Sequence, residues 1–260
     1  MNIAATREHW ALMPHELARR LKARVTDVGD GLLTLAAGSD ALRMNRVIGL
    51  GHRGKAEESM IDEITSIYRA AGLRRFGVMV GPGPQAERIT GWLLARNFRP
   101  RGGLAMLARD ARLAFRIPKS DVRVKRATRA MVPALVSIQE RCFALPVSRR
   151  AWTVASATIP TYERYLAYIG ATAVAVAALR IEGDVAWLGG AGTLTSWRRR
   201  GAQSVLIAAR LRRAARAGCR WAWVETAAPA PGRPAISRRN LLRLGFEDVC
   251  AKPLFVCRIR

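Results

Sequence analysis

Apolar residues recur along the first part of the chain at a spacing that switches between helix and strand periods. Over residues 57–71 they fall on one helical stripe, and Gly72 follows as a stop signal, so this segment predicts a helix with one core-facing side. Short apolar runs bounded by turn residues predict strands. On these grounds we expect helices within residues 1–21 and 89–94, and strands at 31–36 and 76–80.

The second part of the chain alternates in the same way. Helical spacing predicts a helix over residues 130–145, and the spacing of Tyr162, Tyr165 and Tyr168 indicates a helical stretch over 161–168. The apolar runs at 171–180 and 185–188 flank a Glu-Gly-Asp turn, which predicts a hairpin. The pattern is completed by a helix from residue 201, a strand over 221–226 and a short helix over 236–246.

The segment RIPKSD, residues 116–121, separates these two series of elements. We therefore predict two domains, residues 1–116 and 121–260. The chain has 260 residues, of which 50% are hydrophobic, so both domains can form a core.

The turn before Gly201 has the properties of an anion site. A short strand leads into Arg198, Arg199 and Arg200, and Gly201 then opens a helix. The first backbone N–H groups of a helix have no intrahelical partners and lie at the positive end of its dipole. A glycine allows close approach of a ligand, and the arginines add positive charge. This pattern predicts a pyrophosphate site; the alternative is an ordinary surface helix with a glycine in its entry loop.

The elements after this turn carry a family resemblance. Strand, arginine–glycine turn, helix, strand and then Asn-x4-Gly-Phe at residues 240–246 together resemble the acetyl-CoA-dependent N-acetyltransferase (GNAT) superfamily. The phosphate loop of that superfamily reads (Gln/Arg)-x-x-Gly-x-(Gly/Ala). Arg198, Gly201 and Gln203 stand at its three defined positions, and Gln203 departs from the usual small residue. The resemblance covers residues from about 120 to 260.

The first half of the chain resembles the N-terminal half of tandem two-domain GNAT proteins. The resemblance rests on residues 44–51, on residues 92–98 and on the pair Arg109–Asp110. No Arg-x-x-Gly-x-(Gly/Ala) turn precedes a helix in this half, so we expect it to be degenerate and to bind no cofactor.

The resemblance implies an α/β (α+β) fold, with a mixed, mostly antiparallel sheet flanked by helices in two related halves. It implies acetyl-CoA as cosubstrate and an amine of a small molecule or peptide as acceptor. The implied cofactor-binding residues are Thr193, Leu194, Arg198, Arg199, Arg200, Gly201, Ala202, Gln203, Ser204 and Asn240.

The catalytic residue is harder to place than the cofactor loop. Many GNAT proteins use as acid a tyrosine four residues before the Gly-Phe pair, and here that position is Leu241, which cannot donate a proton. Glu225, on the strand after the cofactor helix, is the candidate general base, acting directly or through water. An ion pair between Glu225 and an arginine is the alternative.

The formal net charge of +25 is the other prominent feature of the composition. The basic residues are nearly all arginine and are spread along the whole chain, which predicts nonspecific nucleic-acid binding at low salt rather than sequence recognition. Two functions therefore stand beside acetyl transfer. One is a noncatalytic acyl-CoA-binding sensor on the same fold, and the other is a basic nucleic-acid-binding protein.

Metal and membrane functions lack a sequence signal. The four cysteines form no C-x-x-C pair and the three histidines lie near the N-terminus, so we expect no metal site and a reduced, cytoplasmic protein. The longest apolar stretch, residues 169–179, is too short for a membrane span. Residues 49–54 match G-x-G-x-x-G, but no acidic residue follows at the distance that a dinucleotide site requires.

Overall fold

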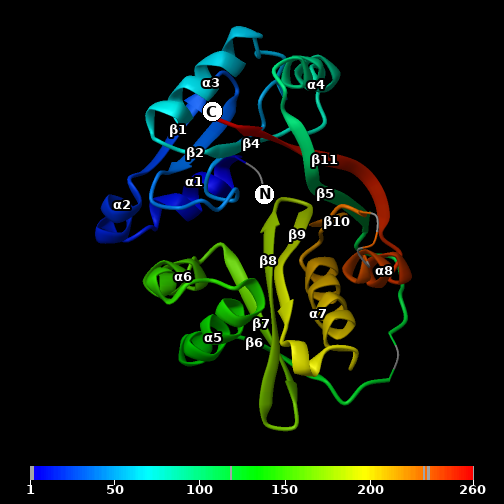
Figure 1. The fold of residues 1–260 in the computed structure, drawn as a ribbon. Helices are drawn as coiled ribbons and strands as arrows, with labels where there is room; N and C mark the ends of the chain where they lie inside the picture. Colours follow the sequence, from blue (N-terminus) through cyan, green and yellow to red (C-terminus); the bar gives the residue numbers. More distant parts are fainter. Residues whose placement is uncertain (1–2, 118, 231, 233–234, 260) are drawn as a thin grey trace. The chain divides into compact units, whose positions relative to one another are not determined.

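The computed structural model describes residues 3–117, 119–230, 232 and 235–259. The chain divides into two compact units, and neither is continuous in sequence. The first contains residues 1–105, 227–234 and 250–260, and the second contains residues 106–226 and 235–249. Figure 1 gives the labels of the elements that follow.

The first unit is built around a mixed sheet with the strand order β1-β2-β3-β4-β11-β5. Its helices are α1 (Ile3–Ala11), α2 (His15–Leu21), α3 (Ser59–Ala70) and α4 (Ala86–Ala95). Its strands are β1 (Ala23–Val28), β2 (Gly31–Ala36), β3 (Arg46–Ile48), β4 (Arg75–Met79), β5 (Arg99–Asp110) and β11 (Glu247–Arg258), the last two of which extend into the second unit. β3 and β4 are parallel, whereas β1–β2, β2–β3 and β4–β11 are antiparallel.

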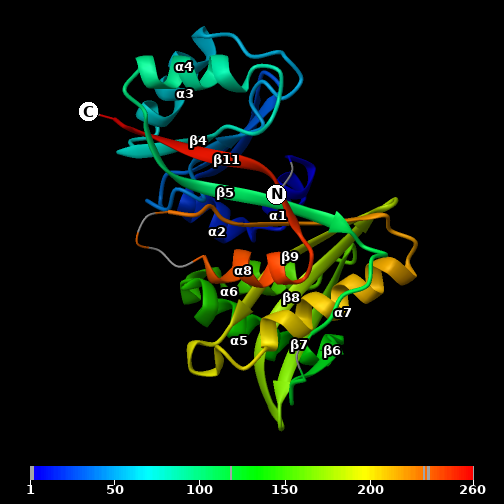
Figure 2. The same cartoon turned by 90° about the vertical axis from the view of Figure 1, so that its right-hand side faces the viewer.

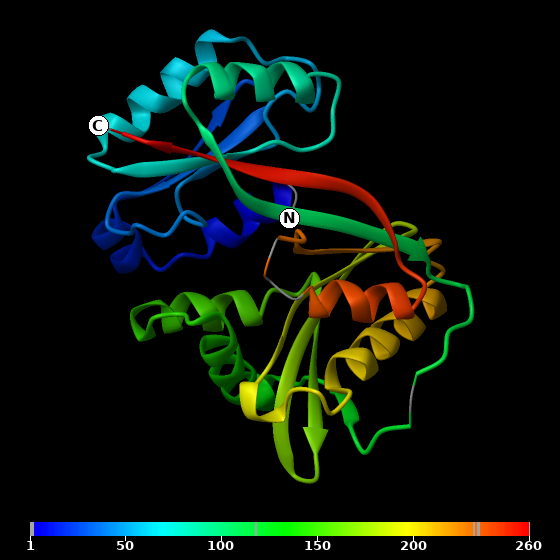
Figure 3. The same ribbon diagram turned by 45° about the vertical axis from the view of Figure 1, so that its right-hand side comes forward.

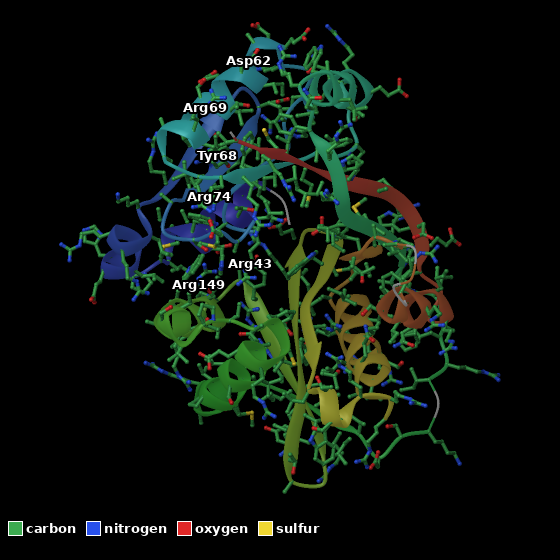
Figure 4. The ribbon with its side chains drawn as sticks, viewed as in Figure 1. Arg43, Asp62, Tyr68, Arg69, Arg74 and Arg149 are labelled. Carbon is green, nitrogen blue, oxygen red and sulfur yellow. The ribbon has the colours of Figure 1, made fainter. Side chains whose placement is uncertain are left out.

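Helices cover both faces of this sheet. Figures 1 and 3 show α3 and α4 on one face and α1 and α2 on the other. The larger core lies under α3 and α4, where Tyr68 (labelled in Figure 4) stacks on Phe76 at 4.3 Å between ring centroids. The Tyr68 hydroxyl donates a hydrogen bond of 2.8 Å to the carbonyl of Thr34, so its only polar atom is satisfied inside the core.

The second unit repeats this architecture. Its strand order is β5-β10-β9-β8-β7-β6, where the elements are β6 (Arg123–Arg126), β7 (Tyr162–Ile169), β8 (Thr172–Glu182), β9 (Val185–Thr193) and β10 (Trp221–Ala227). Its helices are α5 (Val132–Phe143), α6 (Arg150–Ala157), α7 (Ala202–Arg216) and α8 (Ile236–Arg243). β9 and β10 are parallel, and β6, β7, β8 and β9 pair antiparallel. α7 lies along one face of β7–β9, and α5 and α6 lie on the other (Figures 1 and 2).

The two halves of the chain have the same element order. From α1 to β5 the chain forms two helices, three strands, and then a helix, a strand, a helix and a strand. The same series runs from α5 to β11. The predicted fold class, a mixed and mostly antiparallel sheet with flanking helices in two related halves, is therefore confirmed.

Each half contributes its last strand to the other unit. Most of β11 lies in the first unit, where Phe255 pairs with Val78 of β4, and the end of β5 lies in the second unit, where it is the neighbour of β10. The compact units therefore differ from the segments 1–116 and 121–260. The division at residues 116–121 stays a prediction about the two related halves.

One expectation from local pattern is wrong. Residues 161–168 are not helical, because Tyr162–Ile169 forms β7 and pairs with β8 along its whole length. The tyrosine spacing of three mimicked a helix, but cross-strand pairing determines the conformation of this segment. The opening segment is helical as expected and contains two helices, the second of which begins directly after Pro14.

Most of the other predicted elements are confirmed within one to three residues. In the part of the chain that the structure describes, no helix combines the length and the apolar character that crossing a bilayer requires.

Candidate functional site

The segment between β9 and α7 is held in a fixed, non-regular conformation. Leu194 is buried and donates its N–H to the carbonyl of Val174, which anchors the end of β9. A single 3-10 turn, Thr195–Trp197, follows. Arg199 and Gly201 then adopt the left-handed conformation, with φ of 67° and 83°. This sequence of turns brings the chain from the sheet to the first residue of α7.

Side chains from neighbouring segments brace the loop. Arg200 forms an ion pair of 3.1 Å with Asp121, and its guanidinium lies 5.1 Å from the Trp197 ring centroid. Arg198 donates from Nε to the carbonyl of Thr193 at 3.3 Å. Arg198, Arg199 and Arg200 are all exposed. The charges of Arg198 and Arg199 therefore remain available to an anion at this end of α7, whereas the charge of Arg200 is paired with Asp121.

Gly201 is the residue that this geometry demands. Its φ of 83° lies in the left-handed region, and a Cβ there would be 3.2 Å from the Ser120 hydroxyl oxygen. Gly201 is the N-cap of α7 and offers no side chain to cap the helix. Ala202, Gln203 and Ser204 form the first turn, whose N–H groups have no intrahelical acceptors. Gly201 and this first turn together form a cradle of backbone N–H groups that can bind an oxyanion.

Asn240 lies beside this first turn. Its Nδ2 donates a hydrogen bond of 2.8 Å to Oε1 of Gln203, and Asn240 is half-buried. The contact brings together two of the predicted cofactor residues that are far apart in sequence. Leu241, the next residue of α8, is 2% exposed, so its side chain packs in the core and supplies no proton.

A bulge interrupts β9 before it reaches the loop. Val176 of β8 pairs with Gly192, but Ala178 pairs with Gly189, so β9 contains one extra residue in this interval. Gly190 in the bulge has a φ of 56°. The strand therefore changes its pairing just before the segment that leads to Thr193.

Sequence reasoning missed Arg210, which holds this bulge from the α7 side. Arg210 is 1% exposed and donates to the carbonyls of Leu206, Ala178 and Gly189 at 3.0, 3.0 and 3.3 Å. Burial lowers the pKa of its guanidinium to about 9. A charged residue four positions after Leu206, on the apolar stripe of the predicted helix, was the available signal.

β9 and β10 share only a short parallel pairing. Among the described residues, Trp221–Trp223 pairs with Val185–Trp187, although β9 continues to Thr193 and β10 continues to Ala227. Glu225 lies beyond the residues of β10 that pair with β9 and is half-buried. Glu225 is two positions after Trp223, so both side chains point to the same face of the strand. That face is opposite to the one that α7 covers.

The first unit has a loop at the equivalent place, between β3 and α3. Here the Asp30 carboxylate accepts hydrogen bonds of 2.6 Å from the backbone N–H groups of Gly51 and Arg53. These bonds hold the pKa of Asp30 below its usual value, although its partial burial acts in the opposite direction. The G-x-G-x-x-G segment therefore binds a carboxylate of its own chain.

No cluster of three or more His, Cys, Asp or Glu side chains with metal-binding geometry occurs in the described ranges. The four cysteines are free thiols.

Comparison with known proteins finds similar folds among solved structures. The sequence matches no known family description and no curated protein. Solved structures do match. A GCN5-related N-acetyltransferase from Kribbella flavida has a TM-score of 0.62 at 20% identity, over 100% of this chain and 97% of the other. One from Sphaerobacter thermophilus has a TM-score of 0.66 at 15% identity, over 90% of this chain and 82% of the other.

A tandem GNAT protein from the clavulanic acid biosynthesis pathway is similar over nearly the full length. Its TM-score is 0.63 at 15% identity, over 99% of this chain and 96% of that protein. At these identities the similarity concerns the fold. Together with the repeated element order and the loop before α7, it shows that this chain has the fold of the GNAT acetyltransferase superfamily.

Proposed function

We propose that the protein is an acetyl-CoA-dependent N-acetyltransferase that modifies an amine of a small molecule or peptide. The observation that carries the proposal is the cradle at the start of α7, where the left-handed Gly201 leads into first-turn N–H groups without intrahelical acceptors, beside three exposed arginines. Acetyl-CoA fits this cradle because it carries a pyrophosphate. Its thioester supplies an activated acetyl group.

Three sets of residues would hold the cosubstrate. Arg198 to Ser204 face its phosphates with backbone N–H groups and guanidinium groups. The backbone of Thr193, at the end of β9, can hydrogen-bond the pantetheine arm as a neighbouring strand would, whereas the Leu194 N–H already donates to the carbonyl of Val174. Asn240 supports the first turn of α7 through Gln203.

The reaction requires one proton to leave the amine and one to reach the sulfur. The amine nitrogen forms a bond to the acetyl carbon, the carbon–sulfur bond breaks, and the products are an amide and a thiol. We assign the acceptance of the amine proton to Glu225, directly or through water. Because Leu241 replaces the usual tyrosine, the thiolate takes its proton from another source, and catalysis depends chiefly on proximity and orientation.

Calorimetric titration with acetyl-CoA tests the cosubstrate site. We expect micromolar binding to the wild type, and a loss of about 2 kcal/mol, or roughly 30-fold in Kd, for Gly201→Asp, which puts a carboxylate in the cradle. Gly218→Asp is the matched control, because Gly218 has the same φ of 83° at the far end of α7 with open space around it. Equal binding by both variants would contradict the proposed cradle.

The acyl-CoA-binding sensor is the second candidate, and the buried Leu241 is the observation that favours it. Glu225→Gln separates the two. Unchanged acetyl-CoA affinity with lost turnover supports the enzyme, whereas a wild type that binds acetyl-CoA and acetylates no amine supports the sensor.

The net charge of +25 keeps nucleic-acid binding as a third hypothesis. Affinity that falls steeply with salt and is equal for unrelated DNA sequences would indicate nonspecific electrostatic contact. A preferred sequence would favour a nucleic-acid function.

A further inference from the structure

A row of four side chains crosses the sheet of the second unit on the face away from α7. Its members occupy directly paired positions on four adjacent strands: Tyr162, Arg180, Trp187 and Trp223. The orientation follows from the next position on β7, because Glu163 binds Arg213 of α7 at 2.8 Å. Since successive residues of a strand alternate, the row points to the opposite face.

The aromatic members of this row form a continuous apolar surface. The rings of Tyr162 and Trp187 meet edge to face at 5.8 Å, and those of Trp187 and Trp223 lie 6.4 Å apart. A Cβ at Gly189 would lie 1.8 Å from the Trp187 ring, so the indole lies directly over this glycine, toward the bulge of β9. All three rings are only half-buried, so a ligand can reach them.

Arg164 adds a cation to the same face. It lies two residues after Tyr162 on β7, and its guanidinium is 4.8 Å from the Tyr162 ring centroid. One Nη donates to the carbonyl of Ser156, but Nε is buried and has no hydrogen-bond partner among the described residues. Arg180 also lies over the Tyr162 ring, at 5.1 Å, but its Nε is 2.6 Å from the carboxylate of Glu182.

Arg180, Arg126 and Arg213 each form an ion pair with a glutamate. Among the described residues, no carboxylate forms such an ion pair with Arg164. Burial lowers the pKa of its guanidinium to about 10. A partly buried cation without a counter-charge is unfavourable, and an incoming oxyanion would relieve that cost.

The position of this cation connects it to the proposed reaction. Nη1 of Arg164 is 4.0 Å from the place of a Cβ on Gly190, in the β9 bulge. Trp223 and Glu225 are two positions apart on β10, so both side chains point to this face. The acceptor amine must reach Glu225 if that carboxylate takes its proton, so the rest of the acceptor lies against the row or next to it.

We propose that Arg164 and the aromatic row form the acceptor subsite, and that the acceptor is an amine with an oxyanion group, a carboxylate or a phosphate. The oxyanion pairs with Arg164, and the apolar body of the acceptor lies against Trp187 and Trp223. This inference rests on the proposed acetyl transfer and specifies the substrate class of the same site.

The test compares acceptors that differ only in the oxyanion. Release of the CoA thiol is measured with L-phenylalanine and with L-phenylalaninamide, from pH 7 to 9.5 so that amine ionisation is accounted for. We expect kcat/KM to be about 10- to 100-fold higher for the acid, the range of a charge-assisted hydrogen bond. A second pair, O-phosphoethanolamine and ethanolamine, distinguishes a phosphate from a carboxylate.

Arg164→Gln supplies the residue-specific readout. We expect this variant to lose the preference for the oxyanion, with a much larger fall in kcat/KM for the charged acceptor than for its uncharged partner. Arg123→Gln is the matched control, because Arg123 is an exposed arginine that binds the carbonyl of Gly170 outside the row. Acetyl-CoA titration of each variant verifies folding.

The outcomes separate the two levels of the proposal. If acetyl-CoA does not bind to the wild type, the proposed function is wrong and the acceptor subsite is wrong with it. If acetyl-CoA binds but neither oxyanion is preferred, or if Arg164→Gln lowers both members of a pair equally, only the acceptor subsite is overturned. A preference that Arg164→Gln abolishes supports it.

Discussion

Arg210 permits a sharp prediction because its charge and its hydrogen bonds have opposite effects on stability. The guanidinium is almost fully buried and donates to the carbonyls of Ala178 and Gly189, which pair across β8 and β9 at one end of the bulge. We consider two substitutions. Arg210→Met keeps much of the length and removes the charge, and Arg210→Lys keeps the charge and removes the planar fork.

The magnitudes follow from the structure. The fall in the pKa of Arg210 from its ordinary value to about 9 corresponds to a cost of about 5 kcal/mol for the charged form, at about 1.36 kcal/mol per pKa unit. Leaving the carbonyls of Ala178 and Gly189 without this donor costs about 1–3 kcal/mol each. For Arg210→Met the two effects largely cancel, so we expect the free energy of unfolding to stay within about 2 kcal/mol of wild type.

Arg210→Lys has no such compensation. A buried ammonium carries a comparable penalty, and its tetrahedral donors cannot reproduce the bonds of the guanidinium. We expect it to be about 2–3 kcal/mol less stable than Arg210→Met, which urea denaturation would measure from the midpoint and slope. The reasoning is refuted if the lysine variant is the more stable of the two. Both variants should bind acetyl-CoA more weakly than wild type, because the bulge leads directly to Thr193.

Three further predictions concern other described residues. Asp30→Asn should lower the melting temperature at pH 7, because it removes the carboxylate that accepts two backbone N–H groups. Since the folded pKa of Asp30 lies below its unfolded value near 3.8, its stabilisation is present above pH 4 and is lost as pH falls through the folded pKa; the gap in melting temperature between wild type and variant should therefore close in acid. Tyr68→Phe should cost about 1 kcal/mol in urea denaturation, and no change would show that its hydroxyl bond to Thr34 adds nothing. Asn240→Ala should raise the calorimetric Kd for acetyl-CoA through the lost support of Gln203, with unchanged affinity as the contrary result.

The loop before α7 could be predicted because its signal is local. The need for glycine at residue 201, the arginines before it and the apolar stripe after it are all visible within a few residues. The structure adds the left-handed φ of Gly201 and the contact between Asn240 and Gln203. The second of these depends on the packing of α8 against α7, which no local pattern encodes.

The features that sequence reasoning missed depend on pairing over long distances. β7 was interpreted as helical because its tyrosines recur every three residues, but its conformation is set by its neighbours β6 and β8. The row that contains Trp187 and Trp223 exists only because those residues are paired across two strands. Its chemistry therefore becomes visible only when the register is known.

The exchange of last strands has a consequence for the predicted division at residues 116–121. A fragment of residues 121–260 would lack the end of β5, the neighbour of β10 in the second unit. It would also lose the Ala111 N–H that donates to the carbonyl of Arg220 at 2.8 Å, and the Arg109 guanidinium that donates to the carbonyl of Leu244. The exposed edge of β10 would then be an aggregation site.

The complementary fragment would be equally incomplete. Residues 1–116 would lack β11, which covers the edge of β4 from Arg75 to Met79. We therefore expect neither fragment to unfold cooperatively when expressed alone, and we expect both to regain native circular dichroism when they are coexpressed. A fragment of residues 121–260 that unfolds cooperatively and binds acetyl-CoA would contradict this expectation, because the cradle at Gly201 would then be independent of the exchanged strand. On this expectation, a first half that binds no cofactor is still required for the second half to form its site, because it supplies the end of β5 beside β10.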